Sequence, residues 1–258
     1  NTVFPLIEVL STMTTSYGLA GVTDILQPAH QKYKDALYNA GKALEDLMEI
    51  CQSAQFETHE GWEKRASRSH CIVYSKAFNV GTVFTLRAEF NFPVEQLFNE
   101  HWKNFDCTPQ FSRNASFVRR VEVLTPFVDV IHYGLSEAIG IKARDFLAGR
   151  IHRRLGNEIF VATRSFEHKD FEELKNSIRG NLILGGGRIR AHPSDPRKTI
   201  VDYILCADLK GLDASGEKAD QTLIKFMIED IESAKDQIEK IRVRARKQSQ
   251  GDEEEHLF

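Results

Sequence analysis

Nine histidines and four cysteines are the residues of this chain that could bind a metal ion or act in catalysis. The cysteines Cys51, Cys71, Cys107 and Cys206 form no CxxC pair, and no close histidine cluster supplies zinc ligands. The histidines match no HExxH motif, and no GxSxG motif would present a nucleophilic serine. The spacing therefore predicts no metal site and no cofactor, and it argues against an enzyme. It favours reduced, individually buried thiols.

A run of three glycines, Gly185-Gly186-Gly187, is the other segment that could do chemistry, as a phosphate-binding loop. It lacks the GxxxxGK[ST] pattern, and no helical segment follows it. The run predicts a turn or a bulge at a bend in a strand.

The net charge is −3, so the chain lacks the basic excess with which nucleic-acid binders neutralise phosphates. No stretch of about 18 apolar residues is present to span a bilayer, and the first residues lack a basic leader. We expect no nucleic-acid partner and a cytoplasmic location.

The elements that must position a site are mostly strands. From Phe56 onward, β-branched and aromatic residues recur with a period near two, in runs separated by turn residues. Short links between the runs favour antiparallel pairing. The nine expected strands are Gly61–Arg65, His70–Phe78, Thr82–Phe90, Ser116–Leu124, Val128–Leu135, Phe146–Arg154, Glu158–Ser165, Leu182–His192 and Lys198–Asp208.

Apolar residues at three- and four-residue intervals predict the helices. The last of these is the clearest, with one apolar face and one charged face, and at about 28 residues it would be about 42 Å long. The predicted helices are 3–13, 31–53, 93–102 and 220–247, with 14–28 as a connector.

Together these elements predict an α+β domain in which a curved antiparallel sheet grips a long C-terminal helix and leaves a cavity between them. We expect a helical extension or linker over residues 1–30, the domain over 31–248, and an acidic disordered tail over 249–258.

Several short segments, in order, resemble the START family of lipid-binding domains. They include Trp62, Arg144-Asp145-Phe146 followed by Arg150, Ile178-Arg179-Gly180, and Tyr203-Ile204-Leu205-Cys206-Ala207-Asp208-Leu209-Lys210-Gly211. The resemblance extends from about Trp62 to Lys247. It implies a helix-grip fold that binds one hydrophobic lipid and transfers or senses it, with transient membrane contact.

The same resemblance implies that Arg150 faces the cavity. In sterol-binding relatives an acidic residue on the preceding strand faces this arginine, and Tyr133 occupies that position here. An arginine without its carboxylate would suit a lipid phosphate, so a phospholipid is favoured and a sterol is the other option. The alternative is that Arg150 pairs with Asp129 or Glu137 and only stabilises the sheet.

Alternation along the strands and the last helix predicts an apolar lining for the cavity, although the same stripes would also form a filled core. The expected lipid-binding residues are Arg150, Tyr133, Ile131, Phe127, Leu135, Phe146, Met227, Ile228 and Ile231.

A loop containing Ile139, Gly140 and Ile141 corresponds to the family's loop at the tunnel mouth, and it is the predicted gate. Its isoleucines could be exposed and touch a membrane, or the loop could pack on the last helix. A protein-interaction module with a closed cavity is the alternative function, and its partner protein would bind the N-terminal helix or the acidic tail.

Overall fold

The computed structural model describes residues 14–68, 71–138, 140–212 and 216–255, of which 246–255 are described by their backbone alone. The helices are α1 (Lys34–Gln52), α2 (Ala54–Thr58), α3 (Val94–Lys103) and α4 (Glu217–Glu255), with 3₁₀ helices η1 (Pro28–Tyr33) and η2 (Phe105–Gln110). The strands are β1 (Ser16–Leu19), β2 (Val22–Ile25), β3 (Glu63–Arg68), β4 (Cys71–Phe78), β5 (Gly81–Phe90), β6 (Ala115–Thr125), β7 (Val128–Leu135), β8 (Arg144–Leu155), β9 (Glu158–Ser165), β10 (Ile178–Arg179), β11 (Asn181–His192) and β12 (Asp195–Asp208).

Nine long strands form one antiparallel sheet in the order β3-β4-β5-β12-β11-β9-β8-β7-β6, and the two-residue strand β10 pairs in parallel with β8. The nine strands predicted from residue alternation are these nine, with ends that shift by a few residues. The predicted α+β fold, a curved sheet gripping a long C-terminal helix, is confirmed.

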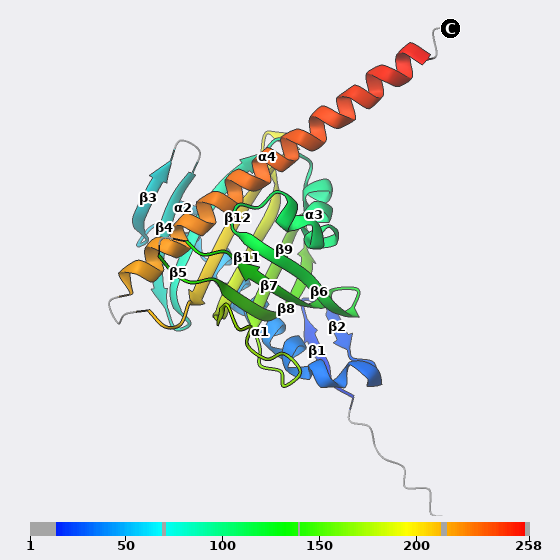
Figure 1. The fold of residues 1–258 in the computed structure, drawn as a ribbon. Helices are drawn as coiled ribbons and strands as arrows, with labels where there is room; N and C mark the ends of the chain where they lie inside the picture. The colour runs from blue at the N-terminus through cyan, green and yellow to red at the C-terminus, as the bar shows by residue number, and fades with distance from the viewer. Residues whose placement is uncertain (1–13, 69–70, 139, 213–215, 256–258) are drawn as a thin grey trace, which may run out of the picture.

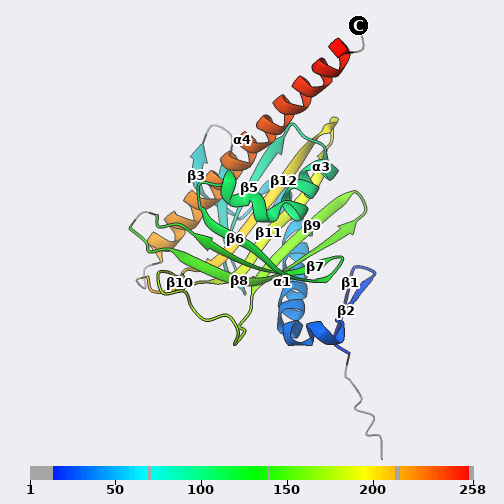
Figure 2. The same cartoon turned by 45° about the vertical axis from the view of Figure 1, so that its right-hand side comes forward.

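The two long helices lie on opposite faces of the sheet (Figures 1 and 2). Alternate residues of β8 show the division, because Leu147 and Ile151 join the core around α1 whereas Phe146 joins the core around α4. We call the side facing α4 the inner face and the side facing α1 the outer face. The C-terminal part of α4 projects beyond the sheet (Figure 1).

The outer face is tightly packed. Leu37, Leu44 and Leu47 of α1 have no exposed surface. Gly149 of β8 has no room for a side chain, since a Cβ there would lie 2.2 Å from the carbonyl oxygen of Ala36. Helix α1 can therefore approach the backbone of β8 directly.

The N-terminal prediction is wrong where it can be examined. Residues within 14–28, predicted as a connector, form a hairpin of β1 and β2, with the turn residues Ala20 and Gly21 both at positive φ (54° and 76°). This hairpin belongs to the domain, because Tyr17 donates a hydrogen bond of 2.6 Å to Glu45 and buried Asp24 pairs with buried Arg153. The predicted helix over residues 3–13 lies outside the described residues.

Two further predictions need correction. Helix α4 continues to Glu255, so most of the segment predicted as a disordered tail is helical; 256–258 lie outside the described residues. The triple glycine lies inside β11, so of the two predicted alternatives the turn is wrong, whereas the register against β12 does shift just before the glycines, between Leu182 and Leu184. Gly186 has a φ of +132°, with a Cβ position 2.0 Å from the Val161 carbonyl oxygen. Only glycine fits a backbone so close to the next strand.

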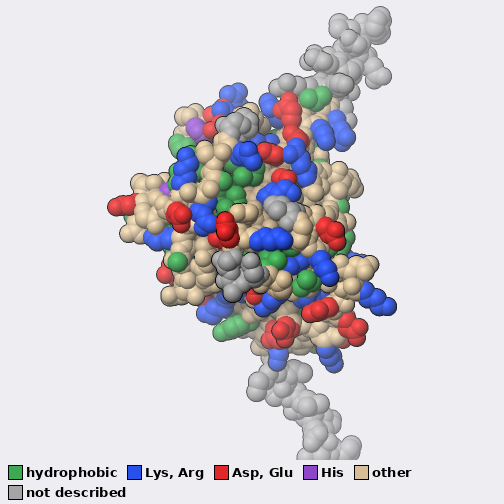
Figure 3. Space-filling view, turned by 60° about the vertical axis from the view of Figure 1, so that its left-hand side comes forward, with side chains coloured by type: hydrophobic (Ala, Val, Ile, Leu, Met, Phe, Trp, Pro, Cys, Tyr) green, Lys and Arg blue, Asp and Glu red, His purple; other side chains and the backbone are tan. Residues whose placement is uncertain are grey.

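The described surface carries both signs of charge. On the face in Figure 3, basic and acidic side chains are interspersed, and hydrophobic side chains form small separate patches. Among the described helices, none is long and apolar enough to cross a membrane.

Candidate functional site

Arg150 points to the inner face, and it has a protein carboxylate as its partner. Its Nε and Nη2 donate to the two carboxylate oxygens of Asp129 at 3.0 and 2.7 Å. The guanidinium also donates to the backbone carbonyls of His101 and Trp102, and it lies 4.0 Å from the Trp102 ring centroid and 4.3 Å from that of Phe105. Both charged side chains are almost fully buried.

This pairing removes the argument for a lipid phosphate. Arg150 is not without a carboxylate, because Asp129 binds it in a bidentate manner. Asp129 also pairs with Arg120 Nε at 3.1 Å, so the two arginines share it. The remaining contacts of Arg150 are aromatic faces and carbonyls. Of the two interpretations of Arg150, the structure agrees with the pair to Asp129 that stabilises the sheet.

Most of the other residues predicted to line a cavity do lie on the inner face. Tyr133 stacks on Phe146 with ring centroids 5.2 Å apart. The buried inner core includes Phe146, Met227, Ile228 and Ile231. Tyr133 and Leu135 pack against this core and are only partly buried. Ile131 lies on the same face of β7 as Tyr133 and is buried as well.

Phe127 is the exception. It packs against the outer-face core and contacts His152 and Arg153. Phe127 lies in the turn before β7, so strand alternation does not apply to it. Its assignment to the cavity lining is therefore wrong.

A polar cluster that sequence reasoning missed lies within the inner face. Asp230 of α4 accepts a hydrogen bond from Asn114 Nδ2 at 2.9 Å and one from the Tyr203 hydroxyl at 3.1 Å. Asn114 immediately precedes the edge strand β6, and Tyr203 lies on β12. One carboxyl group thus connects α4 to two distant parts of the sheet.

Asp230 is enclosed without being tightly packed. Burial raises its pKa to about 6, although part of the side-chain surface remains accessible. Tyr133 and Tyr203 combine the same two properties, since burial raises the pKa of each and both are only partly buried. Each of these three groups is therefore surrounded by protein yet keeps some exposed surface.

A hollow of about 310 Å³ opens at the beginning of α4. Its walls include Phe84, Leu209 and Leu223 of the inner core, and its rim includes Gly211 and Gly216. The lining residues come from β5, β11, β12, α4 and the segment between β12 and α4, and they include Ile183 and Cys206 of the outer-face core.

The predicted gate loop lies beside the beginning of α4. Ile141 is 4% exposed, and it pairs with Ala138 in an isolated bridge. The Lys218 ammonium donates to the Gly140 carbonyl at 3.2 Å. Ile141 is therefore not exposed for membrane contact, and the loop packs at α4; Ile139 lies outside the described residues.

The Arg144-Asp145 pair of the motif has structural roles. Arg144 donates to the backbone carbonyls of Leu209, Lys210 and Lys142, so it joins the gate loop to the segment before α4. Asp145 accepts hydrogen bonds from Ser177 and Arg179, at 2.7 and 2.8 Å, and lies 2.8 Å from His132 Nε2.

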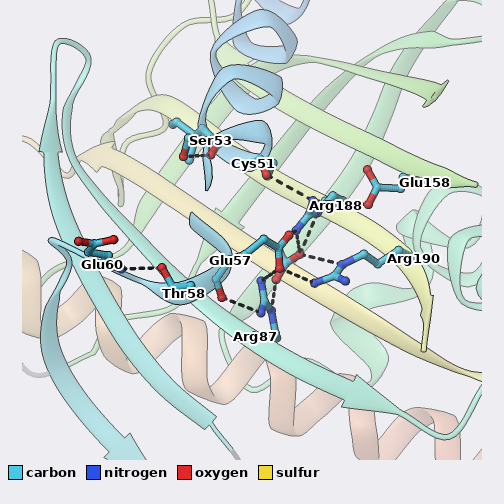
Figure 4. Close-up of polar contacts among 11 residues, drawn as sticks. Cys51, Ser53, Glu57, Thr58, Glu60, Arg87, Glu158, Arg188 and Arg190 are labelled. Carbon is cyan, nitrogen blue, oxygen red and sulfur yellow. Dashed lines mark hydrogen bonds and ion pairs between the residues drawn. The ribbon is translucent and has the colours of Figure 1, made fainter. Parts of the chain in front are cut away.

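A second charged cluster lies on the outer face (Figure 4). Arg188 and Arg87 each form ion pairs with Asp202 and Glu57. Arg190 pairs with the same two carboxylates, and Glu158 lies 3.4 Å from Arg188. Three arginines thus face three carboxylates, so the cluster has no excess charge for a ligand. It attaches α2 to the sheet.

The cysteines are all free, but only Cys51 and Cys206 are buried; Cys71 is partly buried and Cys107 is exposed, so the prediction of four buried thiols is wrong. Within the described part of the chain, no group of three or more His, Cys, Asp or Glu side chains could hold a metal ion.

Comparison with known proteins decides the family. The START domain family model matches residues 43–214. The chain belongs to the START domain family. This START domain is similar to steroidogenic acute regulatory-like protein 1 of Caenorhabditis elegans, with 31% identity over 195 residues, which cover 75% of each chain. It is also similar to the human mitochondrial steroidogenic acute regulatory protein, with 27% identity over 158 residues, 59% of this chain and 55% of the human protein.

Solved structures show the same fold. The START domain superposes on human StAR-related lipid transfer protein 5 with a TM-score of 0.69 at 16% sequence identity, over 81% of this chain and 99% of that one. Lipid binding and transfer are the activities of the family.

Proposed function

We propose that this START domain binds one hydrophobic lipid between the inner face of the sheet and α4, and transfers it between membranes or senses it. The observation that carries the proposal is the construction of the inner face. Tyr133, Leu135, Val201 and Tyr203 remain partly exposed there. The Asp230 carboxyl group, which accepts a hydrogen bond from Tyr203, keeps exposed surface as well. A fully filled core would leave no such surface.

The approach of α4 to the sheet supports the same proposal. Helix α4 lies close to the backbone of β12 and β5, whereas α1 lies close to β8, β9 and β11 on the other face. The hollow at the beginning of α4, together with the gate loop, would form the entrance. Burial of acyl or ring carbons would supply the affinity, at about 0.8 kcal/mol per CH₂.

A phospholipid, which the sequence favoured, loses its main support because Arg150 is already paired with Asp129. A sterol gains support from the relatives, whose names describe steroidogenic regulatory proteins. Transient membrane contact and a cytoplasmic location remain predictions that follow from the role of a carrier.

Native mass spectrometry of the purified chain tests this function. We expect one lipid to be bound, either carried through purification or taken up from vesicles containing sterol and phosphatidylcholine. Ala234→Phe places a ring into the inner face and should abolish uptake, because Ala234 packs against the inner core. Ala77→Phe is the matched control, since Ala77 is exposed on β4.

A wild-type chain that stays empty with every lipid would contradict the proposal. That result would favour the alternative function, a protein-interaction module with a closed cavity.

A further inference from the structure

Three arginine side chains converge on one carboxylate in the charged cluster of the outer face (Figure 4). Arg188 Nη2 donates to Glu57 Oε1. Arg87 Nη2 and Arg190 Nη2 both donate to Glu57 Oε2, at 3.1 and 3.2 Å. The Glu57 side chain is 43% exposed, more than any of its partners in the cluster. It therefore occupies, from the solvent side, a site formed by three guanidinium groups.

The arginines do not depend on Glu57 for their positions. Each of them donates from Nε to Asp202, a carboxylate that is 1% exposed. Asp202 on β12 lies directly between Arg87 on β5 and Arg188 on β11 in the register of the sheet. Arg188 Nη2 also lies 2.8 Å from Asp202, and its Nη1 donates to the Cys51 carbonyl at 3.3 Å. The sheet therefore preforms the site, which lowers the cost of binding.

Helix α2 has an attachment to the domain besides Glu57. Phe56, the preceding residue, has no exposed surface and belongs to the outer-face core. A half-exposed ion pair contributes little to stability beside a buried aromatic side chain. The Glu57 side chain can therefore turn into solvent while α2 stays on the sheet.

The charge of the cluster changes when Glu57 leaves. With Glu57 bound, three arginines face three carboxylates. Without it, Asp202 and Glu158 are the carboxylates that still pair with Arg188, so one positive charge of the three arginines is left over. A guanidinium does not lose its proton, and the Nη2 donors directed at Glu57 lose this acceptor. A ligand would thus replace Glu57 rather than add to a neutral cluster.

The number of donors indicates the class of the ligand. A carboxylate has two oxygens, so Arg87 and Arg190 must share Glu57 Oε2. A phosphate monoester has three terminal oxygens, one for each arginine, and a charge of about −1.5 to −2 at pH 7. Hydrogen bonds between arginine and phosphate are charge-assisted. A phosphate monoester therefore fits the three donors better than the carboxylate does.

We propose that Arg87, Arg188 and Arg190 bind a phosphate monoester, and that Glu57 is the internal group that this ligand displaces. A soluble molecule and a phosphorylated lipid headgroup present the same chemical group. The site lies on the face of the sheet opposite α4 (Figures 1 and 4), so it is separate from the proposed lipid cavity. Its failure would leave the proposed function untouched.

Isothermal titration calorimetry of the full chain with glycerol 3-phosphate tests the site. Glu57→Ala removes the internal occupant, and Glu57→Gln is a second variant that removes the charge but keeps the side-chain volume. Glu232→Ala is the matched control, because Glu232 is also 43% exposed and pairs with one arginine, Arg113. Thermal unfolding of each variant verifies its folding.

We expect Glu57→Ala to bind glycerol 3-phosphate about tenfold more tightly than the wild type, because the ligand no longer has to break partly exposed ion pairs. Glu57→Gln should change the affinity in the same direction, and Glu232→Ala should bind like the wild type. Adding Arg190→Gln to Glu57→Ala should reverse the gain, because it removes one of the three donors. Arg87 and Arg188 keep their bonds to Asp202 in this double variant.

Vesicle flotation distinguishes the two sources of the phosphate. Phosphatidylcholine vesicles that contain phosphatidylinositol 4-phosphate are compared with vesicles that contain phosphatidylinositol, whose phosphate is a diester. Preference of Glu57→Ala for the first vesicles would identify a lipid headgroup, and binding of glycerol 3-phosphate without that preference would identify a soluble ligand; either agrees with the inference. The inference fails if Glu57→Ala binds glycerol 3-phosphate no more tightly than Glu232→Ala does, if Arg190→Gln leaves the gain intact, or if acetate binds Glu57→Ala as tightly as glycerol 3-phosphate.

Discussion

The two faces of the sheet bury apolar side chains against a helix in different ways. On the outer face, Leu37, Leu44 and Leu47 of α1 are 0% exposed, and Gly149 allows contact with the helix backbone. On the inner face, Ile228 and Ile231 retain 8% and 7% exposure, and Ile224 and Ala234 are only partly buried. The outer face is closely packed, whereas the inner face keeps more exposed surface along its helix.

The largest expected effect tests the packing difference directly. Leu44→Ala on α1 should cost about 4 kcal/mol of unfolding free energy, because its rigid surroundings cannot collapse into the cavity. Leu223→Ala on α4 should cost about 2 kcal/mol, since its side chain borders a hollow. Urea unfolding of the lipid-free chain measures both values. Equal losses would mean that the two faces are packed alike.

Two buried ion pairs, one associated with each face, give the next comparison. Asp129→Asn and Asp24→Asn should each cost about 3 kcal/mol, because each leaves a buried arginine without its carboxylate. Only Asp129→Asn removes a carboxylate from the inner face, where it is shared by Arg150 and Arg120. This variant alone should therefore gain binding of phosphatidic acid in a vesicle-flotation assay. A gain in both variants would point to nonspecific binding of an exposed arginine.

The third prediction concerns pH. The pKa of Asp230 is raised by burial from 3.8 to about 6, so the folded state holds this proton more tightly than the unfolded chain does. The resulting stability is fully present below about pH 4 and is lost as the pH rises through about 6. The Asp230→Asn variant has no carboxyl group at this position, so its stability does not fall as the pH rises through this range. Between pH 4 and 7 its unfolding free energy should therefore rise by about 2 kcal/mol relative to the wild type, as measured by chemical unfolding at each pH. If the unfolding free energies of the variant and the wild type changed with pH in parallel, the raised pKa of Asp230 would be contradicted.

The smallest effect concerns the gate. Lys218→Ala removes the hydrogen bond from α4 to the Gly140 carbonyl, which is exposed to solvent. We expect a stability change of about 0.5 kcal/mol and an increase of about twofold in the rate of lipid release to acceptor vesicles, measured by stopped-flow fluorescence. Lys225→Ala, on the same helix but paired with Glu229, is the control.

The sequence was informative where residue periodicity is strong. The nine long strands and the three main helices follow from alternation and from three- and four-residue spacing. The β1–β2 hairpin was missed because its strands have four residues each, too few to establish a period, and its glycines resemble those of a linker. The pairing of Asp129 with Arg150 depends on the register between β7 and β8, where these residues are direct partners. The intervening loop does not fix that register.

The polar cluster had a signal in the sequence that the apolar lining concealed. Asp230 lies three residues after Met227 and four before Ala234, so it falls within the apolar stripe of α4. A carboxylate inside such a stripe indicates a buried polar contact. Its partners Asn114 and Tyr203 could not be predicted, because Asn114 precedes the edge strand β6 and Tyr203 lies on β12, which is distant from β6 in the sheet order.

The three carbonyl contacts of Arg144 have a mechanical consequence for α4. They join Leu209 and Lys210 to the gate loop, and Lys218 joins the first turn of α4 to the same loop, so this end of the helix is the fixed point of a tilt. Asp230 lies about 20 Å along the helix from its first residue, and a tilt of about 10° would displace it by about 3.5 Å. That displacement exceeds the reach of a hydrogen bond, so a small tilt separates Asp230 from both Asn114 and Tyr203. The backbone ladder of the sheet would remain intact throughout.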